Sequence, residues 1–225
     1  MELYENDWVN IDGNSIHKTA TVHPNVKLGT GNTIGAYCVI GGNGEIRGKD
    51  QKEFKGTVEI GDFNVISELV TIQRPFNEGD VTLIGNKCLI MAHSHLGHDV
   101  QIGDEVEICS GSVIGGYVSI GDKSKIKLKT VIRNRVKIGE NAIVGMGSVV
   151  TKDVSDDAVV YGNPARVKEE VMVRNSISKP TPIKPQFDLD EPIHHFESHE
   201  VFKSCLFWGL AIILAVVMII VFATC

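Results

Sequence analysis

The chain has few aromatic residues, no closely spaced cysteine pair and no excess of positive charge. Phe, Trp and Tyr make up 6% of its 225 residues, which excludes a core built from many large rings. The five cysteines are odd in number and widely separated, which argues against a disulfide framework or a thiolate zinc site and fits a reducing compartment. The net charge of −6 argues against a nucleic-acid partner, because such proteins need a basic face.

The two ends of the chain differ in character. The first fifteen residues are acidic and hold no basic, apolar leader, so no secretory signal is expected. Residues 205–225 are apolar apart from Thr224, and a helix of this length reaches roughly 30 Å, the hydrocarbon thickness of a bilayer. The segment predicts a single-pass, C-terminal transmembrane tail anchor, with the rest of the protein cytoplasmic; the alternative is a helix buried in an oligomer core. Residues 168–204 hold four of the seven prolines and are predicted to be a flexible linker.

The central signal is a period of six residues. Aliphatic residues occupy every sixth position in three stretches, Ile16–Ile46, Ile60–Ile72 and Ile84–Val150. A period of six matches neither a helix nor a simple hairpin sheet, but it suits short strands joined by regular turns, three to a coil of eighteen residues. We predict an all-β, parallel β-helix of about seven coils over residues 16–167, preceded by a separate segment at 1–15. Loops are expected at 47–59 and 73–83, between complete coils.

This pattern resembles the hexapeptide-repeat family of left-handed parallel β-helices, whose members are mostly acyltransferases. The left-handed coil is an implication of that resemblance and not of the spacing. The resemblance also implies a homotrimer with active sites between neighbouring prisms.

Histidines cluster at residues 93–98 within the repeat. In an uninterrupted stretch, residues eighteen apart stack in one column at about 4.8 Å per step. The column above His98 contains Gly116, then Asn134, then Lys152. The glycine leaves an open notch with an exposed backbone N–H, so the column suits a thioester beside an imidazole base, with Gly116 as oxyanion donor. Lys152, roughly 14 Å above His98, would meet a phosphate on a long donor arm.

Residues 92–99, followed by Ile102-Gly103, resemble the segment of UDP-N-acetylglucosamine O-acyltransferases that carries their catalytic His-Asp pair. The resemblance implies that His98 is the general base, that Asp99 orients it, and that Gly116 forms the oxyanion hole. Gln73 stands where that family has His, and the loop at 50–54 has an altered order, which puts the acceptor in doubt more than the base. The substrate-binding residues implied are Asp50, Lys52, Gln73, Arg74, His93, His95 and Asn134.

Residues 144–154 and 162–166 resemble the end of hexapeptide acetyltransferases that use acetyl-CoA. The alternative is that this stretch only caps the open end of the repeat. The long-chain lipid A enzymes use acyl carrier protein and add a helical C-terminal domain, whereas residues 168–204 are acidic and interrupted by prolines. In addition, an acidic chain is expected to bind an acidic carrier protein poorly. We therefore expect acetyl-CoA or another acyl-CoA as donor, with acyl carrier protein second. The cofactor-binding residues implied are Gly145, Gly147, Ser148, Lys152 and Arg166.

The sequence thus predicts a membrane-anchored acyltransferase without a metal, which moves an acyl group, first of all acetyl, to a hydroxyl or amine of a nucleotide-linked sugar. Three alternatives stay open. The first is an acyl-carrier-protein-dependent UDP-N-acetylglucosamine acyltransferase of the lipid A type. The second is a zinc protein like γ-class carbonic anhydrase, since His93 and His98 have a separation that such sites use. The third is a non-catalytic, membrane-tethered β-helix.

Overall fold

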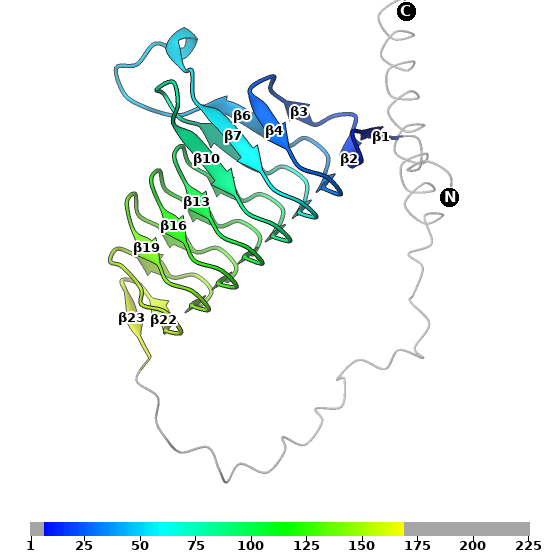
Figure 1. Ribbon diagram of the computed structural model, residues 1–225. Helices are drawn as coiled ribbons and strands as arrows, with labels where there is room; N and C mark the ends of the chain where they lie inside the picture. The colour runs from blue at the N-terminus through cyan, green and yellow to red at the C-terminus, as the bar shows by residue number, and fades with distance from the viewer. Residues whose placement is uncertain (1–6, 169–225) are drawn as a thin grey trace, which may run out of the picture. The chain divides into compact units, whose positions relative to one another are not determined.

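The computed structural model describes residues 7–168, which form a coil of short strands arranged in three parallel sheets, here called A, B and C (Figure 1). Each full turn adds one strand to each sheet, and strands eighteen residues apart pair in register, as Ile90 does with Ile108. The prediction of an all-β, parallel β-helix is confirmed by this pairing, which is consistent with the left-handed coil that the resemblance implies.

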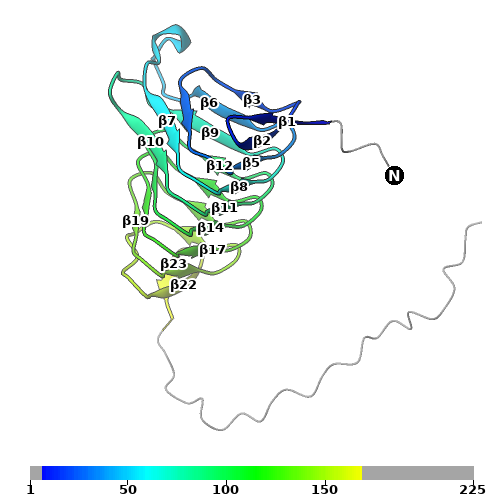
Figure 2. The ribbon, with the colours of Figure 1, turned by 45° about the vertical axis from the view of Figure 1, so that its right-hand side comes forward.

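The strands of each sheet stack in order along the coil, and Figure 2 shows this for sheet A. Sheet A has the order β1 (Trp8–Ile11), β2 (Asn14–His17), β5 (Thr33–Ile34), β8 (Val65–Ile66), β11 (Leu89–Ile90), β14 (Glu107–Ile108), β17 (Lys125–Ile126), β20 (Ile143–Val144), β22 (Val159–Gly162) and β23 (Ala165–Val167). Sheet B has the order β3 (Thr21–Val22), β6 (Val39–Asn43), β9 (Thr71–Arg74), β12 (His95–Leu96), β15 (Val113–Ile114), β18 (Val131–Ile132) and β21 (Val149–Val150). Sheet C has the order β4 (Val26–Leu28), β7 (Thr57–Ile60), β10 (Val81–Ile84), β13 (Gln101–Ile102), β16 (Ser119–Ile120) and β19 (Lys137–Ile138).

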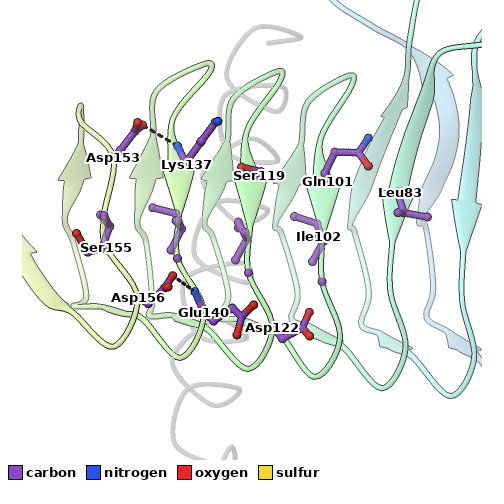
Figure 3. A pocket seen from close by; sticks show the side chains of 16 residues that line it. Leu83, Gln101, Ile102, Ser119, Asp122, Lys137, Glu140, Asp153, Ser155 and Asp156 are labelled. Atoms are coloured by element: carbon purple, nitrogen blue, oxygen red, sulfur yellow. Dashed lines mark hydrogen bonds between the residues drawn. The ribbon is translucent and has the colours of Figure 1, made fainter.

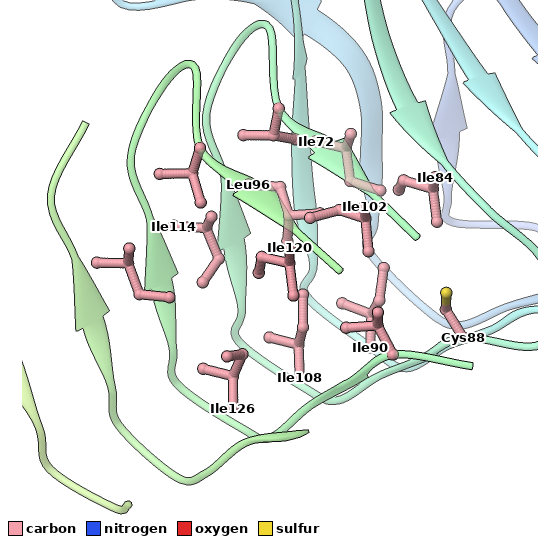
Figure 4. Close-up of a cluster of buried hydrophobic side chains, with 14 of the residues drawn as sticks. Ile72, Ile84, Cys88, Ile90, Leu96, Ile102, Ile108, Ile114, Ile120 and Ile126 are labelled. Atoms are coloured by element: carbon pink, nitrogen blue, oxygen red, sulfur yellow. The ribbon is translucent and has the colours of Figure 1, made fainter. Parts of the chain in front are cut away.

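The core is a set of aliphatic columns, one for each sheet. Each short strand points one side chain inward and its neighbour outward, so the six-residue period places one aliphatic residue of every strand inside. Ile90, Leu96 and Ile102, one from each sheet of the same coil, are almost completely buried (Figure 4). The repeated aliphatic positions therefore determine both the interior and the parallel register.

Two loops interrupt the repeat, and both lead from sheet B to sheet C, so that residues 60–72 form one complete coil between them, as predicted. The first loop begins one strand earlier than expected, because Ile40 in sheet B is its last repeat residue and the next strand of sheet C holds Ile60, which pairs with Leu28. Ile46 was expected in the core but lies half-buried in this loop. The second loop likewise joins β9 of sheet B to β10 of sheet C. A spacing of six does not indicate which sheet an aliphatic residue enters, and this ambiguity is the source of the error.

The two loops pack on one another at the corner between sheets B and C. The rings of Phe54 and Phe76 meet edge to face with centroids 5.1 Å apart, and the ammonium of Lys49 lies 4.2 Å from the Phe76 centroid. The first loop also contains a short 3₁₀ helix, η2 (Gln51–Glu53). Both loops therefore form an ordered layer beside the corner that carries His98.

Antiparallel strands border sheet A at each end. β1 pairs with β2 at the beginning, and β23 pairs with β22 at the end. Residues 8–11, expected to belong to a separate N-terminal segment, are thus part of sheet A.

The predicted membrane localisation is corrected. Among the described residues no helix is long and apolar enough to span a bilayer. The predicted anchor at 205–225, and residues 169–204 of the predicted linker, lie outside the residues that the structure describes.

A ladder of buried asparagines supports the first coils from inside. The amide of Asn64 donates to Asn32 Oδ1 at 3.0 Å and to the Gly85 carbonyl at 3.0 Å, while its own oxygen accepts from the Cys88 N–H at 2.7 Å. Replacing Asn64 with Ala leaves that buried N–H without its partner, so we expect a loss of about 1–3 kcal/mol in the free energy of unfolding. Chemical denaturation measures the loss. Asn77→Ala, in an exposed loop, is the control, and equal stabilities for the two variants would contradict the prediction.

Candidate active site

His98 and Asp99 form a hydrogen-bonded pair at the corner between sheets B and C, directly after β12. Consecutive residues of a strand point to opposite faces, so the pair needs a bend. Asp99 supplies it with a left-handed backbone, φ 61°, and its carboxylate lies 2.7 Å from Nδ1 of His98. Both side chains are 11% exposed. The Asp99 N–H donates to the Thr82 hydroxyl at 2.9 Å, which ties the bend to β10.

Gly116 lies beside the imidazole of His98, one coil further along. A Cβ at this position would come within 2.9 Å of both Cε1 and Nε2 of His98, so only glycine leaves room for the ring. The Gly116 N–H has no hydrogen-bond acceptor within residues 7–168. Nε2 of His98 and a backbone N–H without a partner among the described residues are therefore both present at this position.

The imidazole is enclosed on two further sides. Gly44, from the first loop, lies so close that a Cβ there would be 3.0 Å from the Cβ of His98. The ring of Tyr117 stands perpendicular to the imidazole on another side, with centroids 5.0 Å apart. The Nε2 edge of the imidazole therefore faces the space left open by the missing side chain of Gly116.

Polar side chains on sheet B and the first loop lie near this corner. Nδ1 of His95 is hydrogen-bonded to the Thr71 hydroxyl at 2.7 Å. Nε of Arg74 donates to Asn43 Oδ1 at 2.8 Å, and Gln73 beside it is buried. Burial lowers the pKa of His95, and the nearby Glu45 carboxylate partly offsets this. Of the implied substrate-binding residues, His95, Arg74 and Gln73 thus share this region.

Replacing Glu45 with Gln is expected to lower the pKa of His95 further. The carboxylate stabilises the protonated imidazole, and its removal leaves the opposing effect of burial in place. NMR titration of the histidine ring signals measures the shift. An unchanged or higher pKa would contradict the prediction, and Glu59→Gln, which removes a half-buried carboxylate on β7 of sheet C, is the control.

Other implied substrate residues lie elsewhere or are committed to local contacts. His93 is exposed at the corner between sheets A and B, not at that of His98. The Asp50 carboxylate accepts from the Lys52 N–H at 2.9 Å and so caps η2. Asn134 is exposed and occupies the same corner as Gly116.

The five residues implied in CoA binding do not form one site within a chain. Gly145, Gly147 and Ser148 lie between β20 and β21, at the corner between sheets A and B, whereas Lys152 follows β21 at the His98 corner. Ser148 is completely buried, and its hydroxyl donates to the Gly145 carbonyl and accepts from Gly162. Arg166 belongs to β23 of sheet A. A separation of only a few residues carries the chain from one corner of the prism to the next, which explains the dispersal.

Sequence reasoning did not find Gly44, Glu45 or Tyr117. The first two belong to a loop without the repeat, so no spacing predicts their approach to the histidines. The contact of Tyr117 with the site could have been predicted, because Tyr117 follows Asp99 by the same eighteen residues that relate Gly116 to His98.

A shallow groove of about 620 Å³ crosses the outer face of sheet C (Figure 3). Gln101, Ser119 and Lys137 lie along it, with Asp122 and Glu140 at its edge. His98, Asp99 and Gly116 do not line this groove, so the notch is a separate feature.

The zinc alternative receives no support from the arrangement of ligands. Over residues 7–168 no three His, Cys, Asp or Glu side chains gather closely enough to hold a metal ion. His93 and His98, whose spacing suggested zinc, occupy different corners of the prism.

Comparison with known proteins agrees with this geometry. Residues 82–116 match the family described as bacterial transferase hexapeptide (six repeats). The coil and this match agree with the predicted resemblance to hexapeptide-repeat β-helices.

Within that class, the chain is similar to UDP-N-acetylglucosamine acyltransferases. The acyl-[acyl-carrier-protein]–UDP-N-acetylglucosamine O-acyltransferase of Synechocystis sp. is 32% identical over 142 residues, which are 63% of this chain and 51% of that protein. LpxA, a UDP-N-acetylglucosamine acyltransferase from Bacteroides fragilis, has a structure that matches with a TM-score of 0.66 and 27% identity, over 70% of this chain and 61% of that one. The structure of the Arabidopsis UDP-N-acetylglucosamine acyltransferase matches with a TM-score of 0.64 and 27% identity, over 70% of this chain and 62% of that one. The chain thus spans about half the length of the Synechocystis relative and less than two thirds of either solved structure.

Proposed function

We propose that this chain is an acyltransferase that moves an acyl group from a thioester to a hydroxyl or amine of a nucleotide-linked sugar. The observation that carries the proposal is the His98–Asp99 pair beside Gly116, whose N–H has no partner among the described residues. The relatives named above, which are acyltransferases acting on UDP-N-acetylglucosamine, support it. Because related active sites are implied to lie between neighbouring prisms, the proposed active form is a homotrimer.

In the proposed reaction Nε2 of His98 removes the proton of the acceptor hydroxyl or amine as its oxygen or nitrogen attacks the thioester carbonyl. The Gly116 N–H hydrogen-bonds the oxyanion of the tetrahedral intermediate, and Asp99 stabilises the imidazolium. When the intermediate collapses, the C–S bond breaks and the imidazolium gives its proton to the departing thiolate. The products are the acylated sugar and a free thiol.

The distribution of charge favours an anionic donor at this corner. Although the chain is acidic overall, basic residues are present in the coils beyond Gly116 on the side of His98. Arg133 and Lys152 lie at the corner that carries His98, and Lys137 begins the adjoining strand of sheet C. The objection that an acidic chain is a poor dock for an acidic carrier rested on the net charge and ignored this arrangement.

We propose a donor with a phosphopantetheine thioester, with acyl carrier protein placed ahead of acetyl-CoA. The Synechocystis relative is named as an acyl-[acyl-carrier-protein]-dependent enzyme, and this similarity reverses the order expected from the sequence. For the acceptor we propose UDP-N-acetylglucosamine or a close analogue, contacted by His95, Gln73 and Arg74, with Asn134 near the acyl path.

A transfer assay tests the proposal. The full chain is incubated with acyl carrier proteins bearing acyl groups of increasing length, or with acetyl-CoA, together with UDP-N-acetylglucosamine or its amino-sugar analogue. Mass spectrometry of the acceptor is expected to show an acylated sugar that His98→Ala forms far more slowly. Transfer from acetyl-CoA alone would reverse the order of donors. Absence of transfer with every pair would overturn the proposed function.

A further inference from the structure

Tyr117 occupies the position equivalent to Asp99 in the next coil. Its backbone is likewise left-handed, φ 61°, and its N–H donates to the carbonyl of His98 at 3.0 Å. The two rings lie at 88° to one another with centroids 5.0 Å apart. Within the described residues the Tyr117 hydroxyl makes no hydrogen bond, so the aromatic ring is what contacts His98.

Arg135 occupies the same position one coil further along. Its φ is 66°, and its N–H donates to the Gly116 carbonyl at 3.0 Å. The guanidinium carbon lies 4.1 Å from the centroid of Tyr117, a distance suited to a cation–π contact. Arg135, Tyr117 and His98 therefore form a continuous row of contacts along the corner.

We infer that Tyr117 and Arg135 are positioning residues for His98, an inference that rests on the proposed function. The hydrogen bond that Nδ1 of His98 donates to Asp99 fixes one nitrogen of the imidazole but leaves the ring free to tilt about that contact. The perpendicular ring of Tyr117 restrains the tilt, and Arg135 holds the tyrosine ring in turn. These two contacts keep Nε2 at the notch beside Gly116, where the acceptor and thioester would react.

Substitutions that separate ring, hydroxyl and charge test this inference. Tyr117→Leu and Arg135→Gln are expected to lower kcat about tenfold with little change in the KM of either substrate, because a small misplacement of a reacting group has a large effect on rate. Tyr117→Phe and Arg135→Lys keep the ring and the charge and should retain most of kcat. Lys129→Gln is the matched control, because it removes a cation from the same coil at another corner residue whose backbone is left-handed.

Two further measurements separate positioning from a structural or substrate-binding role. In a His98→Ala background Tyr117→Leu should have no additional effect on kcat, because it acts through the imidazole. In the substrate-free protein, the ring signals of His98, assigned by their absence in His98→Ala, should shift in Tyr117→Leu and stay unchanged in Tyr117→Phe. An unshifted signal in Tyr117→Leu, or a raised KM that persists without His98, would overturn the inference. Full activity in His98→Ala would instead overturn the proposed role of His98.

Discussion

Replacing His98 with Ala is expected to lower kcat by about 10²–10⁴, the range associated with loss of a general base. The KM values should change little, because the imidazole accepts a proton as the new bond forms and contributes less to binding of the ground state. Steady-state kinetics with the donor and acceptor found in the transfer assay measure the effect. His23→Ala, in the first coil and without a carboxylate partner among residues 7–168, is the control.

Asp99→Asn separates the effect of the carboxylate charge from the effect of the size of the side chain. It preserves the size of the side chain at 2.7 Å from Nδ1 but removes the negative charge that stabilises the imidazolium. A substantial loss in kcat is therefore expected in this variant too. If His98→Ala kept full activity in a correctly folded protein, His98 would not be the base.

The regular part of the fold was predictable because translation by eighteen residues repeats both the interior and the corners. From residue 84 onward no loop interrupts the coil, and there the juxtaposition of His98 with Gly116 follows from counting. The same count relates Tyr117 to Asp99 and Arg135 to Tyr117. These contacts need no information beyond the period and the rise of one coil.

Contacts across the loops could not be derived in this way. The loop after β6 has no period, and its Gly44 reaches His98 from a segment more than fifty positions earlier in the sequence. Counting by six also failed to show which sheet Ile60 would enter, because every sheet accepts the same aliphatic residue. Arg133, Lys137 and Lys152 were visible in the sequence, but the net charge of the chain does not show that the coil brings them to the side of His98.

Gly116→Ala is expected to lower kcat by about 10²–10³, the range reported for removal of one oxyanion donor. The new methyl group would come within 2.9 Å of Cε1 and Nε2 of His98, so the imidazole must move, and the methyl would also occupy the notch in which the oxyanion is proposed to lie. The fold should persist, because the conflict is with a partly exposed side chain at the corner and not with the buried aliphatic columns.

Adding His98→Ala to Gly116→Ala separates two causes of the expected loss in kcat. If displacement of the imidazole accounts for the effect, Gly116→Ala has no further consequence once the ring is absent. If the N–H also stabilises the oxyanion, part of the loss remains in the double variant. Thermal unfolding checks that each variant is folded. A Gly116→Ala protein that unfolds normally and keeps kcat within about threefold, far less than loss of an oxyanion donor, would show that this rung of the corner takes no part in the reaction.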